Sequence, residues 1–249
     1  MRHLKRLLGI PAVLGLALIL VACGSDTSPP ASGTAAEAAP AGQATAIDAA
    51  ANGRASAGQA LSGTRTFIIA PASSTAAYIV NEEFFSLALD KLGIEAGKRV
   101  VTGSTSNVTG QLTVNFDAGT VEEGRIVVDM TTLTTDQNRR DNWIREDGPR
   151  FNQFPEAVFV VTDVENAPAE YAAGETVTFQ LLGDLTVRDV TRPVTFDVTA
   201  AVDGSTLTGV AETSLNISDF GIEPPDFANT LTVADPFTIR VELTAETQQ

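Results

Sequence analysis

The sequence predicts an all-β domain of about eight antiparallel strands, preceded by a long N-terminal segment of different composition. Three observations lead to this prediction. Apolar and polar residues alternate in several stretches, turn signals separate those stretches, and every aromatic residue lies between Phe67 and Phe237. Alternation with a period of two is typical of strands that have one buried and one exposed face. Eight or so strands joined by short turns form either a sandwich or a closed barrel.

The first residues of the chain have the pattern of an export signal. Basic residues within positions 2–6 precede an apolar run over residues 7–21, which is too short to cross a bilayer comfortably. The run ends on Leu20, Val21, Ala22 and Cys23, which resembles the lipobox of bacterial lipoproteins. That resemblance implies a signal peptide over residues 1–22 and a lipid-modified Cys23, carrying palmitate among its acyl chains. An ordinary signal peptide or a membrane anchor with an incidental cysteine is the alternative.

Export as a lipoprotein would place the chain in the cell envelope, outside the cytoplasm and anchored to a membrane, for instance in a periplasm. Loss of residues 1–22 removes three basic residues and no acidic ones, which changes the net charge from −15 to −18. Such a surface disfavours nucleic acid as a partner, because phosphate binding needs clustered Lys and Arg. It also means that the covalent lipid, rather than surface charge, would hold the protein on its membrane.

The composition divides the remaining chain in two. Residues 23–65 contain mainly Ala, Gly, Ser, Thr and Pro and no aromatic residue, so we expect a lipidated cysteine followed by a disordered tether. Residues 66–249 have a size suited to one domain. The sequence leaves open whether this domain forms a homodimer.

Four stretches of the domain predict strands most clearly: residues 108–116, 177–187, 194–202 and 237–243. Residues 117–119 and 203–205 supply turns between strands. Residues 81–92 predict one short helix, with Asn81 as its N-cap and Gly93 at its end. Residues 134–155 predict a long irregular connection that contains Trp143 and Ile144, and a loop of that length is typically functional.

Several motifs follow one another in a specific order: residues 140–145 (RDNWIR), 151–155 (FNQFP), 183–194 (GDLTVRDVTRPV) and 218–222 (SDFGI). In this order they resemble the signature segments of the YceI-like, polyisoprenoid-binding family, over about residues 66–245. The extended segment 145–150, the predicted helix and the tether depart from that pattern.

The resemblance implies a lipocalin-like antiparallel barrel whose apolar interior holds a long-chain isoprenoid lipid. Small residues on inward strand positions agree with an open interior, although a filled core is the default interpretation of each inward aromatic residue taken singly. These small residues are Gly110, Gly183, Ala200, Gly209 and Ala211. The candidates for the cavity wall are Phe116, Met130, Trp143, Ile144, Phe159, Phe179, Leu185, Phe196 and Phe237, with Trp143 and Ile144 as a lid.

Arginines in these motifs have two interpretations. Arg140, Arg188 or Arg192 could bind a polar or phosphorylated head group at the barrel mouth, because a guanidinium suits an anion. The alternative is structural: Arg140 pairs with Asp141 to fix the long loop, and Arg188 or Arg192 donates to backbone carbonyls.

Three functions remain open at this stage. We expect a non-catalytic carrier or store of a polyprenyl or quinone-type lipid, with no cofactor. The alternatives are an envelope protein-interaction module with a filled barrel, and an enzyme that uses carboxylates on a bound lipid. The only histidine, His3, lies in the predicted signal peptide, so a Ser-His-Asp or Cys-His catalytic system and a His/Cys zinc site are not expected.

Overall fold

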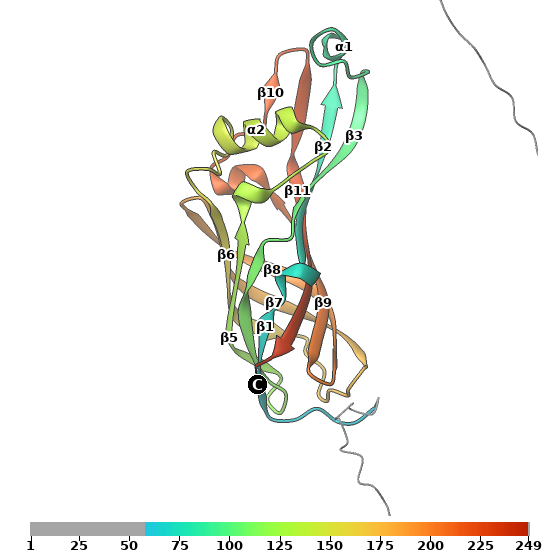
Figure 1. Ribbon diagram of the computed structural model, residues 1–249, viewed down its shortest axis with the longest axis vertical. Helices are drawn as coiled ribbons and strands as arrows, with labels where there is room; N and C mark the ends of the chain where they lie inside the picture. The colour runs from blue at the N-terminus through green and yellow to red at the C-terminus, as the bar shows by residue number, and fades with distance from the viewer. Residues whose placement is uncertain (1–57, 249) are drawn as a thin grey trace, which may run out of the picture. The chain divides into compact units, whose positions relative to one another are not determined.

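A computed structural model describes residues 58–248 of the chain (Figure 1). Within these residues the strands form one antiparallel sheet that closes on itself. The sheet runs β1-β4-β5-β6-β7-β8-β9-β11, and β11 pairs again with β1, which completes a ring of eight strands. The predicted antiparallel barrel of about eight strands is therefore confirmed.

The strands are β1 (Thr64–Ile69), β2 (Thr75–Phe84), β3 (Gly97–Thr105), β4 (Val108–Asn115), β5 (Thr120–Asp129), β6 (Glu156–Glu165), β7 (Thr176–Val187), β8 (Val190–Asp203), β9 (Thr206–Asn216), β10 (Asp226–Phe227) and β11 (Leu231–Thr247). The helices are α1 (Leu87–Leu92) and α2 (Asn138–Glu146), and the 3-10 turns are η1 (Pro71–Ser73), η2 (Met130–Thr132) and η3 (Ile217–Phe220).

The long strand β11 organises the barrel. One of its edges pairs with β9 over residues 236–246, and its other edge pairs first with β2 and then with β1. The turn η1 separates β1 from β2 and begins at Pro71, which has no backbone N–H for a ladder hydrogen bond. Strands β2 and β3 thus extend beyond the closed ring, and Figure 1 shows them with α1, α2 and β10 at one end of the domain.

Alternation along the strands gives the barrel its apolar interior. In β8, Val194, Phe196 and Val198 are buried, whereas Thr195, Asp197 and Thr199 between them are exposed. The same alternation recurs along the neighbouring strand β7, whose Leu181 lies opposite Phe196. Period-two patterning therefore places one face of the sheet inside and one outside, as the sequence predicts.

The structure shortens the predicted helix over residues 81–92. Residues 81–84 belong to β2, where Glu82 lies opposite Val233 and Phe84 lies opposite Leu231. Only α1 is helical, and Gly93 ends it in the left-handed conformation with φ of 72°. The helix-start signals at Asn81 and Glu82 are overridden because β11 supplies a strand partner for this segment.

The connection over residues 134–155, predicted to be irregular, contains the nine-residue helix α2. Its N-cap, Gln137, makes no side-chain cap hydrogen bond, and its buried residues are Asp141 and Ile144. A helix without a cap signal and with so little apolar periodicity is hard to recognise from sequence. No helix between residues 58 and 248 is both long and apolar enough to span a bilayer.

Part of the predicted tether lies within the described region. The backbone N–H of Leu61 donates to the carbonyl oxygen of Tyr171 at 2.7 Å, and that of Gly58 donates to Ala173 at 2.9 Å. Leu61 is buried, and β1 begins at Thr64. Residues 58–65 are thus in contact with the domain, whereas the signal peptide, Cys23 and the rest of the tether lie outside the described residues.

Candidate functional site

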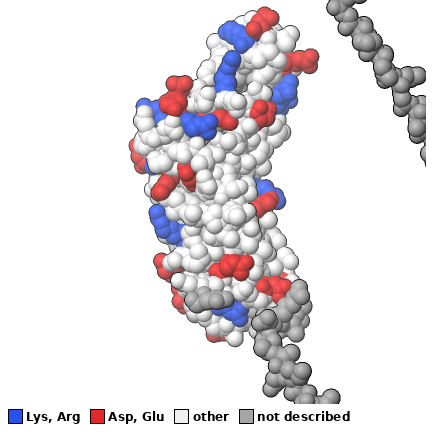
Figure 2. Space-filling view, viewed as in Figure 1, with Lys and Arg blue, Asp and Glu red and all other residues white. Residues whose placement is uncertain are grey.

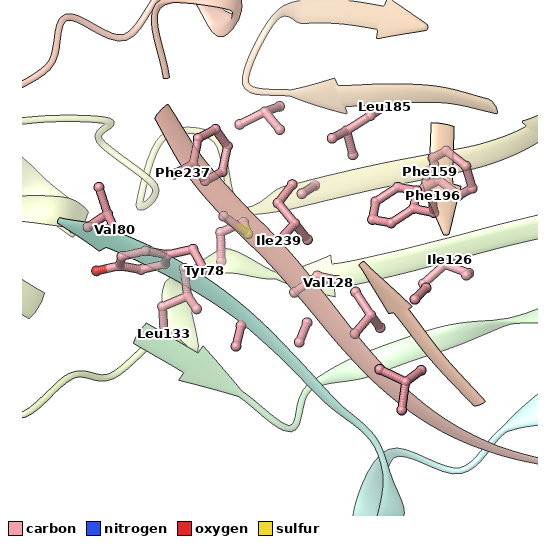
Figure 3. A pocket seen from close by; sticks show the side chains of 18 of the residues that line it. Tyr78, Val80, Ile126, Val128, Leu133, Phe159, Leu185, Phe196, Phe237 and Ile239 are labelled. Atoms are coloured by element: carbon pink, nitrogen blue, oxygen red, sulfur yellow. The ribbon is translucent and has the colours of Figure 1, made fainter. Parts of the chain in front are cut away.

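The interior of the barrel holds a cavity of about 1250 Å³. Small-molecule sites usually enclose about 300–1,000 Å³, so this cavity is large for its class. Its wall consists mainly of apolar side chains that point inward from the strands (Figure 3). Phe159 and Phe196 meet edge to face there, with ring centroids 5.0 Å apart. The inward faces of the strands therefore enclose space rather than a filled core.

All nine side chains predicted for the cavity wall line this cavity: Phe116, Met130, Trp143, Ile144, Phe159, Phe179, Leu185, Phe196 and Phe237. They come from four strands (β6, β7, β8 and β11), the turn that follows β4, one 3-10 turn and one helix. The structure thus brings together residues that lie as far apart as positions 116 and 237 in the chain.

The small interior residues divide into two groups. Ala200, Gly209 and Ala211 line the cavity and leave space there. Gly183 does not, because a Cβ at this position would overlap the ring of Phe159 and the carbonyl oxygen of Val160. Gly110 likewise lies against the backbone of Arg125. These two glycines permit close packing, so the prediction that they open the interior is wrong.

Helix α2 covers one part of the cavity and carries Trp143 and Ile144. The Trp143 ring meets Phe227 of β10 edge to face, with centroids 5.8 Å apart. Arg145 fixes the helix to the segment that precedes it by donating to the carbonyl oxygens of Leu133 at 2.9 Å and Thr131 at 3.3 Å. The two side chains predicted to form a lid are therefore held by a helix rather than by a mobile loop.

A buried ion pair links α2 to β2. Arg140 donates from Nε to Oε1 of Glu82 at 2.9 Å and from Nη2 to Oε2 at 2.8 Å, and Nη1 reaches Asp136 at 2.6 Å. Burial lowers the pKa of Arg140, but the Glu82 and Asp136 carboxylates more than offset this and raise the pKa above its ordinary value. An unpaired carboxylate would be costly to bury, and the two hydrogen bonds from the Arg140 guanidinium compensate for the burial of Glu82.

Asp141 is not the partner of Arg140, contrary to the structural interpretation of the motif. Asp141 is buried and accepts hydrogen bonds from the backbone N–H of Thr135 at 2.9 Å and from its hydroxyl at 2.6 Å. Since adjacent residues on a helix point in different directions, Arg140 reaches β2 while Asp141 holds the turn before the helix.

Tyr78 is a lining residue that the sequence analysis missed. It points into the cavity from β2, next to Val80 (Figure 3), and lies opposite Gly103 of β3. Burial raises the pKa of the Tyr78 hydroxyl well above its ordinary value, and the Glu82 carboxylate adds to this while Arg140 opposes it. The alternation of Ala76, Tyr78, Val80 and Glu82 could have revealed the residue, but the helix assigned from residue 81 hid that strand pattern.

A family model for the YceI-like domain matches residues 68–245, which is well over half of the chain. The chain belongs to the YceI-like domain family. Similar sequences include proteins described as UPF0312. The chain is 31% identical over 165 residues to a UPF0312 protein of Pseudomonas putida (strain GB-1), and the match covers 63% of this chain and 81% of the relative. It is 30% identical over 170 residues to a UPF0312 protein of Pseudomonas savastanoi, covering 64% and 84% of the two chains.

Solved structures share the fold of this YceI-like domain. Burkholderia cenocepacia BcnA superposes with a TM-score of 0.51 at 19% identity, covering 71% of this chain and 98% of BcnA. A polyisoprenoid binding domain from Saccharophagus degradans, implicated in plant cell wall breakdown, gives a TM-score of 0.51 at 11% identity, covering 74% and 99%. At these identities the likeness establishes a common fold.

Arg188 and Arg192, the other two candidates for binding a head group, lie outside the cavity wall. Arg188 donates to the carbonyl oxygen of Gly221 at 3.2 Å and lies over the ring of Phe154, and Arg192 donates to the carbonyl oxygen of Asp219 at 3.0 Å. Both therefore tie the β7–β8 turn and the start of β8 to the η3 segment. Of the three candidate head-group arginines, the structure brings only Arg140 to the cavity.

The charged residues of the YceI-like domain are spread over its outer surface. Figure 2 shows Lys and Arg interspersed with Asp and Glu on the face in view, without a continuous basic patch. Within residues 58–248, no group of three or more His, Cys, Asp or Glu side chains is arranged to hold a metal ion. The large, mainly apolar cavity is therefore the candidate functional site of the described domain.

Proposed function

We propose that this YceI-like protein is tethered to a membrane outside the cytoplasm and holds or carries a long-chain polyisoprenoid or quinone-type lipid in its barrel cavity. The observation that carries the proposal is the cavity itself, which is mainly apolar and, at about 1250 Å³, larger than most small-molecule sites. An apolar wall with few polar groups favours an apolar ligand, because burial of each CH₂ group contributes about 0.8 kcal/mol. The polyisoprenoid binding domain of S. degradans, which shares the fold, supports the same ligand class.

The cavity also distinguishes this proposal from its alternatives. An interaction module with a filled barrel would have its interior closed by side chains, whereas about 1250 Å³ is open here. An enzyme acting on the lipid would need reactive groups along the wall, and the wall is mainly apolar. We therefore propose binding rather than catalysis.

The lipid can be tested on the full-length chain, purified in mild detergent without added ligand. Extraction with organic solvent and mass spectrometry should recover a long isoprenoid chain in a fixed ratio to protein. Ala200→Phe, which projects into the cavity from β8, should reduce the recovered lipid several-fold. Thr199→Phe is the matched control, because the neighbouring side chain is exposed on the outer face of the same strand. Absence of lipid in the wild type, together with no binding of added polyprenyl chains, would contradict the proposal.

The location requires its own test. Cells fed an alkyne-labelled palmitate should attach the label to the wild-type protein and not to Cys23→Ser, and the wild type alone should sediment with membranes. This expectation follows from the basic, apolar and lipobox-like segments that precede Gly24. A labelled or fully membrane-bound Cys23→Ser variant would overturn the lipoprotein assignment and leave the lipid-binding proposal intact.

A further inference from the structure

Of the polar side chains of the cavity wall, seven lie on β2, on α2 or on the segment that leads into α2. In Figure 3 the Tyr78 ring lies at the opposite side of the view from the Phe159 and Phe196 rings. If the cavity holds an isoprenoid lipid, as proposed above, the polar head of that lipid should lie at this end, where hydrogen-bonding groups are available. These side chains are Tyr78, Glu82, Asp136, Gln137, Asn138, Arg139 and Arg140.

Arg140, the cation best placed to bind a phosphate, is already occupied. Its guanidinium has five N–H donors, and four of them are directed at acceptors within the protein. Two go to Glu82, one to Asp136 and one to the hydroxyl of Thr135 at 3.1 Å. An anionic head group could bind Arg140 through two N–H groups only by displacing one of these acceptors, and displacement of Glu82 would leave its carboxylate buried without a partner.

The local charge also opposes an anion. The charged groups that act on the Tyr78 hydroxyl are Arg140 and the carboxylates of Glu82, Asp136 and Asp141, which together leave an excess of negative charge. A diphosphate placed among them would add further negative charge at short range, where like charges repel strongly. Lys91 and Arg139 also line the cavity, but like Asp136 they are exposed, so solvent and salt screen all three charges. The shielded groups Arg140, Glu82 and Asp141 still leave one negative charge in excess.

Tyr78 offers what a neutral head group needs. The Tyr78 side chain is partly buried, its hydroxyl makes no hydrogen bond to another described residue, and burial raises the pKa of that hydroxyl, which keeps it protonated. It can therefore donate to a carbonyl oxygen or accept from a hydroxyl. Gly103 leaves room for the ring in this position, because any Cβ at residue 103 would overlap the Tyr78 ring.

We infer that this cavity selects isoprenoid lipids with an uncharged, hydrogen-bonding head group, such as a quinone, phenol or alcohol. Tyr78 binds that head group, and the Glu82–Arg140 pair with Asp136 and Asp141 excludes phosphorylated forms of the same chain. The inference rests on the proposed lipid binding and adds the chemical class of the ligand and the residues that determine it.

Three lipids with the same 20-carbon chain test the selection: geranylgeraniol, menaquinone-4 and geranylgeranyl diphosphate. An equimolar mixture is added to delipidated full-length protein in mild detergent, and native mass spectrometry measures the fraction that carries each lipid. The alcohol and the quinone should each occupy at least tenfold more protein than the diphosphate. Equal or greater occupancy by the diphosphate would overturn the inference while supporting lipid binding. No occupancy by any of the three would instead contradict the proposed function.

Two variants that each remove one hydroxyl test the role of Tyr78. Tyr78→Phe should weaken binding of the alcohol and the quinone by about threefold to tenfold, the usual effect of one hydrogen bond. Binding of phytane, a 20-carbon hydrocarbon without a head group, should be unchanged. Ser214→Ala is the matched control, because it also removes one hydroxyl, but from the exposed face of β9 outside the cavity wall. Equal effects of the two variants, or none, would remove Tyr78 from the head-group site.

Glu82→Gln tests the exclusion of anions. The amide keeps the shape of the carboxylate and one acceptor for Arg140 but removes a negative charge. The ratio of diphosphate to alcohol bound should therefore rise at least several-fold, and the fraction of folded protein is checked by circular dichroism. An unchanged ratio in a folded variant would show that the buried pair does not set the preference.

Discussion

Arg140 of α2 donates two hydrogen bonds to Glu82 of β2, a residue 58 positions earlier in the chain. The pair is well shielded, with the Arg140 side chain 14% exposed and that of Glu82 5% exposed. It holds the helix that carries Trp143 and Ile144 against the strand that carries Tyr78. The Glu82–Arg140 pair thus joins α2, which covers part of the cavity, to the polar end of the cavity on β2.

Loss of this pair should destabilise the protein substantially. Arg140→Ala leaves the Glu82 carboxylate buried and unpaired, so we expect the free energy of unfolding to fall by about 3–5 kcal/mol. Urea denaturation followed by circular dichroism measures the change. Arg240→Ala is the matched control, because Arg240 pairs with Glu212 and Glu242 on an exposed strand face and should matter little. Similar losses in both variants would show that burial of the Glu82–Arg140 pair has no special effect.

Tyr78 should make stability depend on pH at the alkaline end. Burial raises the pKa of its hydroxyl in the folded state above the value of about 10 expected in the unfolded chain. The folded protein therefore retains this proton where the unfolded chain loses it. The contribution is fully present below pH 10 and declines as the pH rises toward the folded-state pKa.

The measurement compares wild type with Tyr78→Phe in urea from neutral to alkaline pH. The wild type should lose free energy of unfolding more steeply above about pH 10 than the variant does. In Tyr171→Phe, where Tyr78 is the only tyrosine left, tyrosinate absorbance should rise only as the protein unfolds. Titration of Tyr78 near pH 10 in the folded protein would contradict the assigned burial effect.

Strand patterning in the sequence is sufficient to predict the antiparallel strands and their inward residues, but it leaves a sandwich and a closed barrel open. Inward residues such as Phe196 and Phe237 follow from a period of two, because a strand can bury only one face of this sheet. What alternation cannot decide is whether inward side chains meet each other or leave a space, since both arrangements give the same pattern. The family resemblance, rather than the pattern, favoured the space.

The polar end of the cavity depends on tertiary contacts that local signals do not contain. Asn81 and Glu82 look like the start of a helix, but β11 recruits them into β2, and Glu82 is then buried. Its partner Arg140 lies on a helix with no cap signal. Proximity in sequence favours Asp141 as the partner of Arg140, whereas the folded chain brings Glu82 of β2 next to Arg140 of α2.

Gly183 should be intolerant of any side chain. A Cβ at this position overlaps the Phe159 ring and the carbonyl oxygen of Val160 in the adjacent strand. We therefore expect Gly183→Ala to lower the free energy of unfolding by about 1–3 kcal/mol through overpacking. Asp184→Ala, at the next residue on the exposed face of β7, should have little effect in the same urea titration. An unchanged stability for Gly183→Ala would mean that Phe159 can move into the cavity at no cost.

The cavity predicts a contrast between two phenylalanines. Phe67 of β1 is fully buried and packs against Phe116, whereas Phe237 of β11 lines the cavity and lacks packing partners on that side. Phe67→Ala should cost about 3–5 kcal/mol, as usual for a close-packed core. Phe237→Ala should cost clearly less in the delipidated protein, because fewer dispersion contacts are lost.

Bound lipid supplies the missing contacts, so the cost of Phe237→Ala should increase in lipid-loaded protein while that of Phe67→Ala stays the same. Thermal unfolding of both variants with and without geranylgeraniol measures this difference, and equal costs in the delipidated protein would argue that the interior collapses when it is empty.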